Sequence, residues 1–126
     1  MKGSTKRASI TMVLLAGILL VGSPAVAAKG GPVTVYTSEG SCSEEWENFL
    51  SGGLRYGSSM SLGGGCGTNQ TRIKFNGYYG PTWTSWSYGS GDSQGWLSLK
   101  SNSTATQTHH RFLEPGLSQR NFYLNV

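Results

Sequence analysis

The sequence predicts an all-β domain: a small sandwich or barrel of short antiparallel strands with one short helix and a single disulfide. Runs of alternating β-branched and aromatic residues recur at intervals of about ten residues. Glycine clusters separate these runs, and the chain contains 19 glycines. Two cysteines, an even number, can supply one covalent link.

The first 27 residues have the pattern of a secretory signal peptide. Basic residues precede an apolar run, Ile10–Val21, and small residues follow up to Ala27. The run is shorter than the roughly 20 residues that a membrane helix needs, and no later segment is as apolar, so we expect no membrane span. Cleavage after Ala27 would leave residues 28–126 as a single secreted, extracellular β domain.

The distribution of charge argues against nucleic acid as a partner. The whole chain carries a net charge of +4, but three of its ten Lys and Arg lie in the predicted signal peptide, whereas all six acids follow it. Seven cations against six acids leave a net charge of +1 in residues 28–126. Such a domain attracts phosphates weakly, so we expect no nucleic-acid partner.

Both cysteines, Cys42 and Cys66, lie in the predicted exported part, where an oxidising compartment favours a disulfide. A metal or redox pair would be spaced more closely, as in Cys-x-x-Cys. Closing a loop of this length should stabilise the fold by about 3 kcal/mol in the chain-entropy account.

One segment favours a helix. In Ser41–Leu50, the apolar residues Trp46, Phe49 and Leu50 fall at i, i+3 and i+4, which is a helical spacing. A serine opens the segment three residues before a glutamate, the spacing of a capping box. We expect a short helix here, with an edge strand as the alternative.

The remaining elements are expected to be strands, because each is an alternating run bounded by turn residues. They comprise residues 33–37, 54–62, 72–75, 78–88, 96–100, 104–112 and 119–126.

Residues 72–88 hold the densest aromatic cluster and the clearest turn signal. Asn76-Gly77 follows an alternating run and supplies the two positive-φ residues that a type I′ turn requires. We expect a tight hairpin with its turn at these two residues, in which Phe75 lies opposite Tyr78.

The period of two then assigns faces in this hairpin. Arg72 and Lys74 would share the solvent face with Tyr79 and Trp83, whereas Trp86 would point inward. A bulge at the intervening proline would exchange the faces of the two tryptophans. At least one tryptophan is therefore expected on the less buried face, unless a second sheet covers both.

The sequence offers one weak catalytic motif. Ser93 lies in Gly91–Gly95, which fits Gly-x-Ser-x-Gly, and His109 or His110 would be its base. That motif requires a strand, a sharp turn and a helix, but a strand is expected to follow it here. We therefore expect no catalytic residues.

Two further groups of polar residues have simpler explanations than chemistry. Glu44, Glu45 and Glu47 would favour the amino end of the predicted helix, so a carboxylate pair for sugar hydrolysis is not expected. His109 and His110 are adjacent on a predicted strand and would point to opposite faces, which prevents them from sharing a metal ion. We expect no metal and no cofactor.

The aromatic cluster is the best candidate for function. Rings on a rigid sheet stack on sugars or anchor a protein partner, although they would equally serve as the core of a domain with few leucines and isoleucines. We expect the ligand-binding residues to be Tyr79, Trp83, Arg72 and Lys74.

In outline, a short signal-bearing chain with an aromatic, glycine-rich β domain resembles lactococcin-like bacteriocins and the small secreted proteinase or amylase inhibitors of soil bacteria. The resemblance transfers no individual residue. It implies the alternative function, a secreted antagonist acting through residues 89–95 or the disulfide loop. Our first expectation is a monomeric, non-enzymatic protein that binds a cell-surface polysaccharide or an extracellular protein. A small hydrolase using Ser93 is a third class.

Overall fold

The computed structural model describes residues 27–90, 94–99 and 104–126, with the backbone alone for residues 94–99. Residues 1–26 of the predicted signal peptide and Ser93 lie outside the described residues. Within them, no helix is long and apolar enough to cross a membrane.

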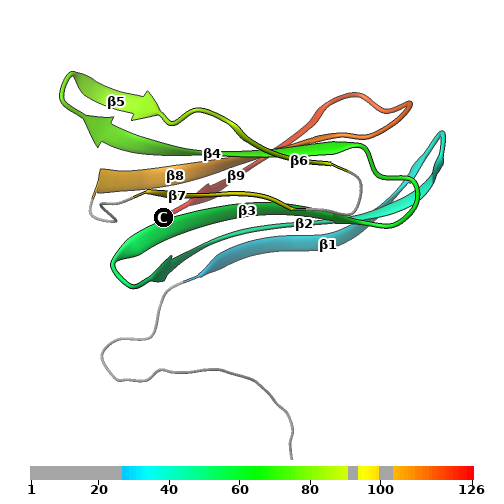
Figure 1. The fold of residues 1–126 in the computed structure, drawn as a ribbon, viewed down its shortest axis with the longest axis horizontal. Coiled ribbons are helices and arrows are strands. Elements are labelled where there is room, and N and C mark those ends of the chain that lie inside the picture. The colour runs from blue at the N-terminus through cyan, green and yellow to red at the C-terminus, as the bar shows by residue number, and fades with distance from the viewer. Residues whose placement is uncertain (1–26, 91–93, 100–103) are drawn as a thin grey trace, which may run out of the picture.

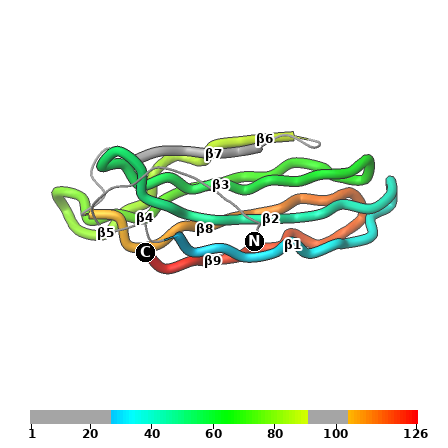
Figure 2. The backbone as a smooth tube through the Cα atoms, turned by 90° about the horizontal axis from the view of Figure 1, so that it is seen from below, coloured from blue at the N-terminus to red at the C-terminus, as the bar shows by residue number. Residues whose placement is uncertain are grey.

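The described residues form two antiparallel sheets that pack face to face (Figure 1), which confirms the all-β expectation and specifies a sandwich. One sheet has the order β1-β2-β3-β7; the other has the order β5-β4-β8-β9, with β6 also paired to β4. In Figures 1 and 2, β6 lies beside β7 at one edge of the sandwich. The strands are β1 (Ala28–Thr37), β2 (Gly40–Ser51), β3 (Leu54–Leu62), β4 (Thr68–Gly77), β5 (Gly80–Trp83), β6 (Ser87–Ser90), β7 (Gln94–Leu99), β8 (Ala105–Leu113) and β9 (Arg120–Asn125).

The predicted helix at residues 41–50 is wrong, because this segment is the central part of β2. The strand lies between β1 and β3, so it is not an edge strand either. Alternate side chains are buried along it, and the inward ones are Cys42, Glu44, Trp46 and Asn48. Two of these four are polar, which hides the period of two from a reading based on hydrophobicity.

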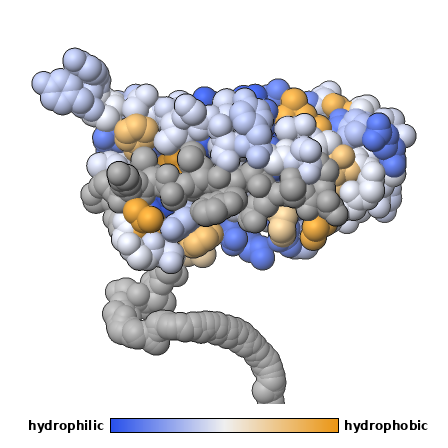
Figure 3. All heavy atoms as spheres, viewed as in Figure 1, coloured by the Kyte–Doolittle hydropathy of each residue, from blue (hydrophilic) through white to orange (hydrophobic). Residues whose placement is uncertain are grey.

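The hairpin within residues 72–88 has its turn two residues later than predicted. Tyr78 and Tyr79 form the turn, while Asn76 and Gly77 belong to β4 and pair with β5. Gly80 has a φ of 115°, a conformation that side chains disfavour, and it takes the strained position at the end of the turn. Tyr78 is therefore not inward: the two tyrosines are 93% and 97% exposed on a tip that projects from the body (Figure 3).

The return strand of this hairpin is interrupted, and the interruption puts both tryptophans on one face. β5 ends at Trp83, and Thr84 then bridges to β4 through its N–H to the Ile73 carbonyl (2.9 Å) and through its hydroxyl oxygen, which accepts from the Ile73 N–H (3.0 Å). Strand pairing with β4 resumes at Ser87. Trp83 and Trp86 consequently both lie on the outer face of the five-stranded sheet, so the predicted inward orientation of Trp86 is wrong.

The core contains few apolar residues and many polar ones. Trp46 crosses the space between the sheets, stacking on Phe122 with ring centroids 3.8 Å apart and meeting Phe112 edge to face at 6.0 Å. The aromatic residues of 78–88 are therefore not the core. The buried apolar side chains among the described residues are Cys42, Trp46, Ile73, Ala105 and Phe112.

The disulfide between Cys42 and Cys66 is confirmed. It joins β2 to the segment that leads into β4 and therefore links the two sheets covalently. The stabilisation of about 3 kcal/mol stays a prediction of the chain-entropy account for a sequence separation of 24.

Candidate functional site: the outer face of the five-stranded sheet

Three rows of outward side chains cross the five-stranded sheet, because directly opposed residues in antiparallel strands point to the same side. We call these rows, together with Trp86, the cationic face. The first row is Tyr88, Gln70, Arg111 and Asn121; the second is Arg72, His109 and Tyr123; the third is Trp83, Lys74, Gln107 and Asn125.

Cations and indole rings alternate along this face. The guanidinium of Arg111 lies 4.0 Å from the centroid of Trp86, and the guanidinium of Arg72 lies 4.4 Å from Trp86 and 4.3 Å from Trp83. The ammonium of Lys74 continues the series at 5.8 Å from Trp83. We call this series of cations and indole rings the ladder. Each such contact contributes about 0.5–2 kcal/mol, so the ladder holds the interrupted segment after β5 against the sheet.

His109 lies beneath this ladder and is only 3% exposed. Its ring contacts Trp86 edge to face at 4.8 Å and stacks on Tyr123 at 4.2 Å. Its Nδ1 accepts from Arg72 Nε at 3.1 Å, so the proton of the neutral ring is on Nε2, which donates to Asn121 Oδ1 at 2.8 Å. Burial lowers the pKa of His109; the Asn121 hydrogen bond opposes this effect and the charges of Arg72 and Arg111 add to it.

The cationic face carries positive charge without an acid among its described residues. Arg72, Lys74 and Arg111 occupy three successive rows. Burial, followed by the charge of Arg111, lowers the pKa of Arg72 below its ordinary value. Glu45 and Glu47, by contrast, alternate with the inward residues of β2 and therefore lie on the opposite outer face of the sandwich.

Two polar atoms in the first row have no hydrogen-bond partner in the described part of the chain: Gln70 Oε1 and Arg111 Nε. The two residues are directly opposed on β4 and β8. Gln70 is only 7% exposed, so its acceptor is shielded from bulk water. Both atoms are buried, so among the described residues the fold leaves them unsatisfied and closed to a ligand.

The structure brings together three of the four residues predicted to bind a ligand. Arg72, Lys74 and Trp83 meet in the ladder. Tyr79 lies apart from it, at the hairpin tip, where its ring meets that of Tyr78 edge to face at 4.8 Å.

Several members of the cationic face were missed by sequence reasoning, among them Trp86, His109, Arg111 and Tyr123. Alternation within β8 does place His109 and Arg111 on the same face of that strand, and alternation within β9 assigns Tyr123 to one of its two faces. Nothing local, however, indicates that β8 pairs with β4, because these strands are not consecutive in the chain.

His110, a candidate base in the sequence, lies inside the sandwich and is 0% exposed. Its Nδ1 is 3.0 Å from Ser59 Oγ, and its Nε2 is 2.8 Å from Thr108 Oγ1, which also accepts from Asn48 Nδ2 at 3.1 Å. Burial, followed by the charge of His109, lowers the pKa of His110 to about 3. This network is sealed from substrates and holds the sheets together.

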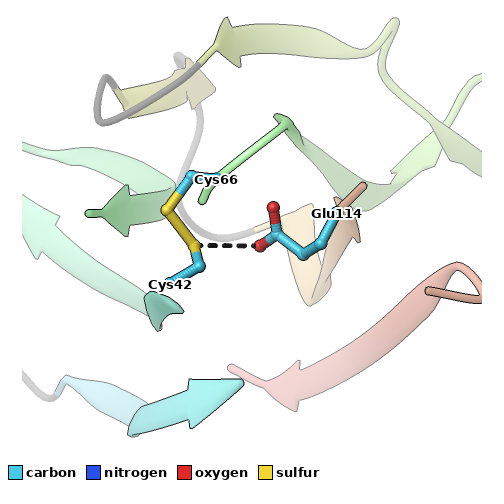
Figure 4. A group of neighbouring side chains, drawn as sticks. All are labelled: Cys42, Cys66 and Glu114. Atoms are coloured by element: carbon cyan, nitrogen blue, oxygen red, sulfur yellow. Dashed lines mark hydrogen bonds between the residues drawn. A yellow bond between two sulfur atoms is a disulfide. The ribbon is translucent and has the colours of Figure 1, made fainter. Parts of the chain in front are cut away.

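Cys42, Cys66 and Glu114 have ligand atoms close enough for a metal ion, as Figure 4 shows. The two sulfurs are bonded to each other, however, and a thiolate is what binds metal. Glu114 Oε1 instead accepts from the Gly67 N–H at 2.7 Å, and Oε2 contacts Cys42 Sγ at 3.3 Å. Glu114 therefore packs against the disulfide, and the cluster is not a metal site.

Glu44 is a second fully buried titratable group. Arg120 Nε donates to its Oε1 at 2.9 Å. Burial, followed by the neighbouring carboxyl of Glu114, raises the pKa of Glu44 to about 7, against the opposing effect of Arg120. Its carboxyl is therefore half protonated near neutral pH.

No protein-family model, no curated protein and no solved structure matches this chain.

Proposed function

We propose that this chain is a secreted, non-enzymatic protein that binds a polysaccharide through the cationic face. The observation that carries the proposal is the ladder of rings and cations that continues across the sheet into a row of amides. Tyr123 is 53% exposed and offers a ring for stacking on a sugar. Asn121, Gln107 and Asn125 offer amides that both donate to and accept from hydroxyl groups.

The rigidity of this face favours binding. Side chains that are already stacked lose little rotational freedom when a ligand arrives, so more of the contact energy appears as affinity. Arg72 is fixed between two indoles and bonded to His109, and Tyr123 is stacked on the same imidazole.

Co-sedimentation with insoluble cell-wall polysaccharide tests the proposal, using protein purified after expression of the complete sequence. Tyr123→Ala and Trp83→Ala should each weaken binding roughly three- to tenfold, since a ring contact contributes about 0.5–1.5 kcal/mol. Tyr36→Ala is the matched control, because Tyr36 is 79% exposed but lies on β1 of the other sheet. Circular dichroism establishes that each variant is folded. Unchanged binding by both folded variants would exclude the cationic face.

The alternative function, a secreted antagonist, is favoured by one observation. Two almost fully exposed tyrosines on a projecting tip, bounded by Gly77 and Gly80, have the form of an element that inserts into a pocket of a target protein. Growth inhibition of neighbouring bacteria that is lost in Tyr79→Ala but retained in Tyr123→Ala would support this function over the first.

A further inference from the structure

We infer that the polysaccharide bound by the cationic face is acidic, a polymer that carries carboxylate or sulfate groups along its length. The inference rests on the proposed function and adds the chemical class of the ligand. Three observations carry it: the uncompensated charge of the face, the N–H groups that its guanidinium groups leave free to donate and the spacing of its cations in three successive rows.

The charge of the face is uncompensated. Arg72, Lys74 and Arg111 are crowded together, and the charge of Arg111 helps to lower the pKa of Arg72. Of the described acids, Glu44 and Glu114 are buried, and Glu45 and Glu47 lie on the opposite outer face of the sandwich. Repulsion among the three cations is relieved when an anionic ligand arrives, whereas a neutral ligand leaves it in place.

The ladder leaves the charged groups able to donate. The guanidinium carbon of Arg72 lies over two indole rings, and the N–H groups of a guanidinium point outward from the edge of its plane. Among the described residues, Arg72 makes one side-chain hydrogen bond, from Nε to His109. The edge of a guanidinium matches the two oxygens of a carboxylate or a sulfate, so the stacked arginines are preorganised for such groups.

The spacing favours a polymer over a single anion. Residues two apart on a strand are about 7 Å apart, so Lys74, Arg72 and Arg111 present one positive charge in each of three successive rows. A chain with negative charges at regular intervals can meet all three, whereas a small anion meets one.

The exposed polar and aromatic side chains beside the cations favour a sugar polymer over other polyanions. Tyr123 is 53% exposed and offers a ring for stacking on a sugar, and the amides of Gln107, Asn121 and Asn125 donate to and accept from hydroxyl groups.

Polygalacturonate and its methyl-esterified form test the inference, because they share a backbone and differ in charge. We expect the protein, purified after expression of the complete sequence, to bind the acidic form at least tenfold more tightly in titrations followed by tryptophan fluorescence. The affinity should fall steeply with added NaCl. Lys74→Gln should weaken binding severalfold and reduce the salt dependence. Lys29→Gln removes the same charge from the other sheet, where Lys29 lies 4.0 Å from Glu45, and should have no effect.

Several outcomes would overturn the inference, and they separate it from the proposed function. Equal, salt-insensitive affinity for both forms would exclude an acidic ligand but leave polysaccharide binding standing. No binding to either form, or to the insoluble wall polysaccharide, would reject both proposals. Equal loss in Lys29→Gln and Lys74→Gln would show attraction by net charge alone. Affinity for single-stranded DNA equal to that for polygalacturonate would show a surface for polyanions and not for sugars.

Discussion

The free energy of unfolding is expected to change less with pH between 4.5 and 6.5 than below pH 4.5, where it falls, because two buried groups with opposite pKa shifts offset each other in the upper range. His110 and Glu44 are both fully buried. Each group changes the free energy of unfolding with pH over its own range. Substituting one of the two residues should therefore reveal the pH dependence that the other contributes.

His110 has a pKa of about 3 in the folded protein and 6.5 in the unfolded chain. Between these values the unfolded state binds more protons, so stability rises with pH. The stabilisation is complete above pH 6.5 and is lost as the pH falls towards 3, a total on the order of 5 kcal/mol. His109, whose pKa burial also lowers, contributes with the same sign.

Glu44 behaves in the opposite way, with a pKa of about 7 in the folded protein and 4.5 in the unfolded chain. Between these values the folded state binds more protons, so stability falls as the pH rises. The slopes of His110 and Glu44 therefore cancel where the two windows overlap, each being about 1.4 kcal/mol per pH unit.

Urea denaturation at pH values from 3 to 8 measures these slopes. His110→Gln should leave the Glu44 slope, so that stability falls as the pH rises from 4.5 to 7. Glu44→Gln should leave the histidine slope, so that stability rises from pH 3 to 6.5 and then levels off. Parallel pH profiles for the two variants and the wild type would show that neither group is buried as described.

Replacing Trp46 with alanine is expected to destabilise the protein by about 3–5 kcal/mol, the usual cost of removing a buried tryptophan. Trp46 is 8% exposed and is the ring that joins one sheet to Phe112 and Phe122 of the other. The core has few other apolar side chains to close the cavity. For a domain of this size, the loss is a large part of a total stability of about 5–15 kcal/mol.

Trp83→Ala is the matched control for this experiment. It removes a ring of the same size from the cationic face, where contacts with Arg72 and Lys74 are lost but no core cavity forms. We expect a cost of about 1–2 kcal/mol. If thermal unfolding shows Trp83→Ala to be the more damaging of the two, the assignment of Trp46 to the core and Trp83 to the surface is incorrect.

The fold class and the disulfide could be predicted because their signals are local. Alternating runs and glycine turns mark strands, and two cysteines can pair in only one way. β2 could not be recognised, because the residues it buries include Glu44 and Asn48, which stabilise the interior through Arg120 and Thr108. Such partners are distant in the chain and invisible to a hydrophobic pattern.

The candidate site was predicted in part for the same reason. Arg72, Lys74 and Trp83 belong to one hairpin, so alternation alone brings them together, even though the turn lies at Tyr78 and not at Asn76. Arg111 joins them only through the pairing of β4 with β8, which local sequence does not encode.

Mapping of amide chemical shifts during titration with polygalacturonate tests the central claim most directly, because it locates the bound polymer on the protein. The account predicts that shifts concentrate on β4, β8 and β9 and on the indole N–H of Trp83, with β1 and β2 unaffected. Shifts confined to the Tyr78–Tyr79 tip, or to the outer face that carries Glu45 and Glu47, would contradict it.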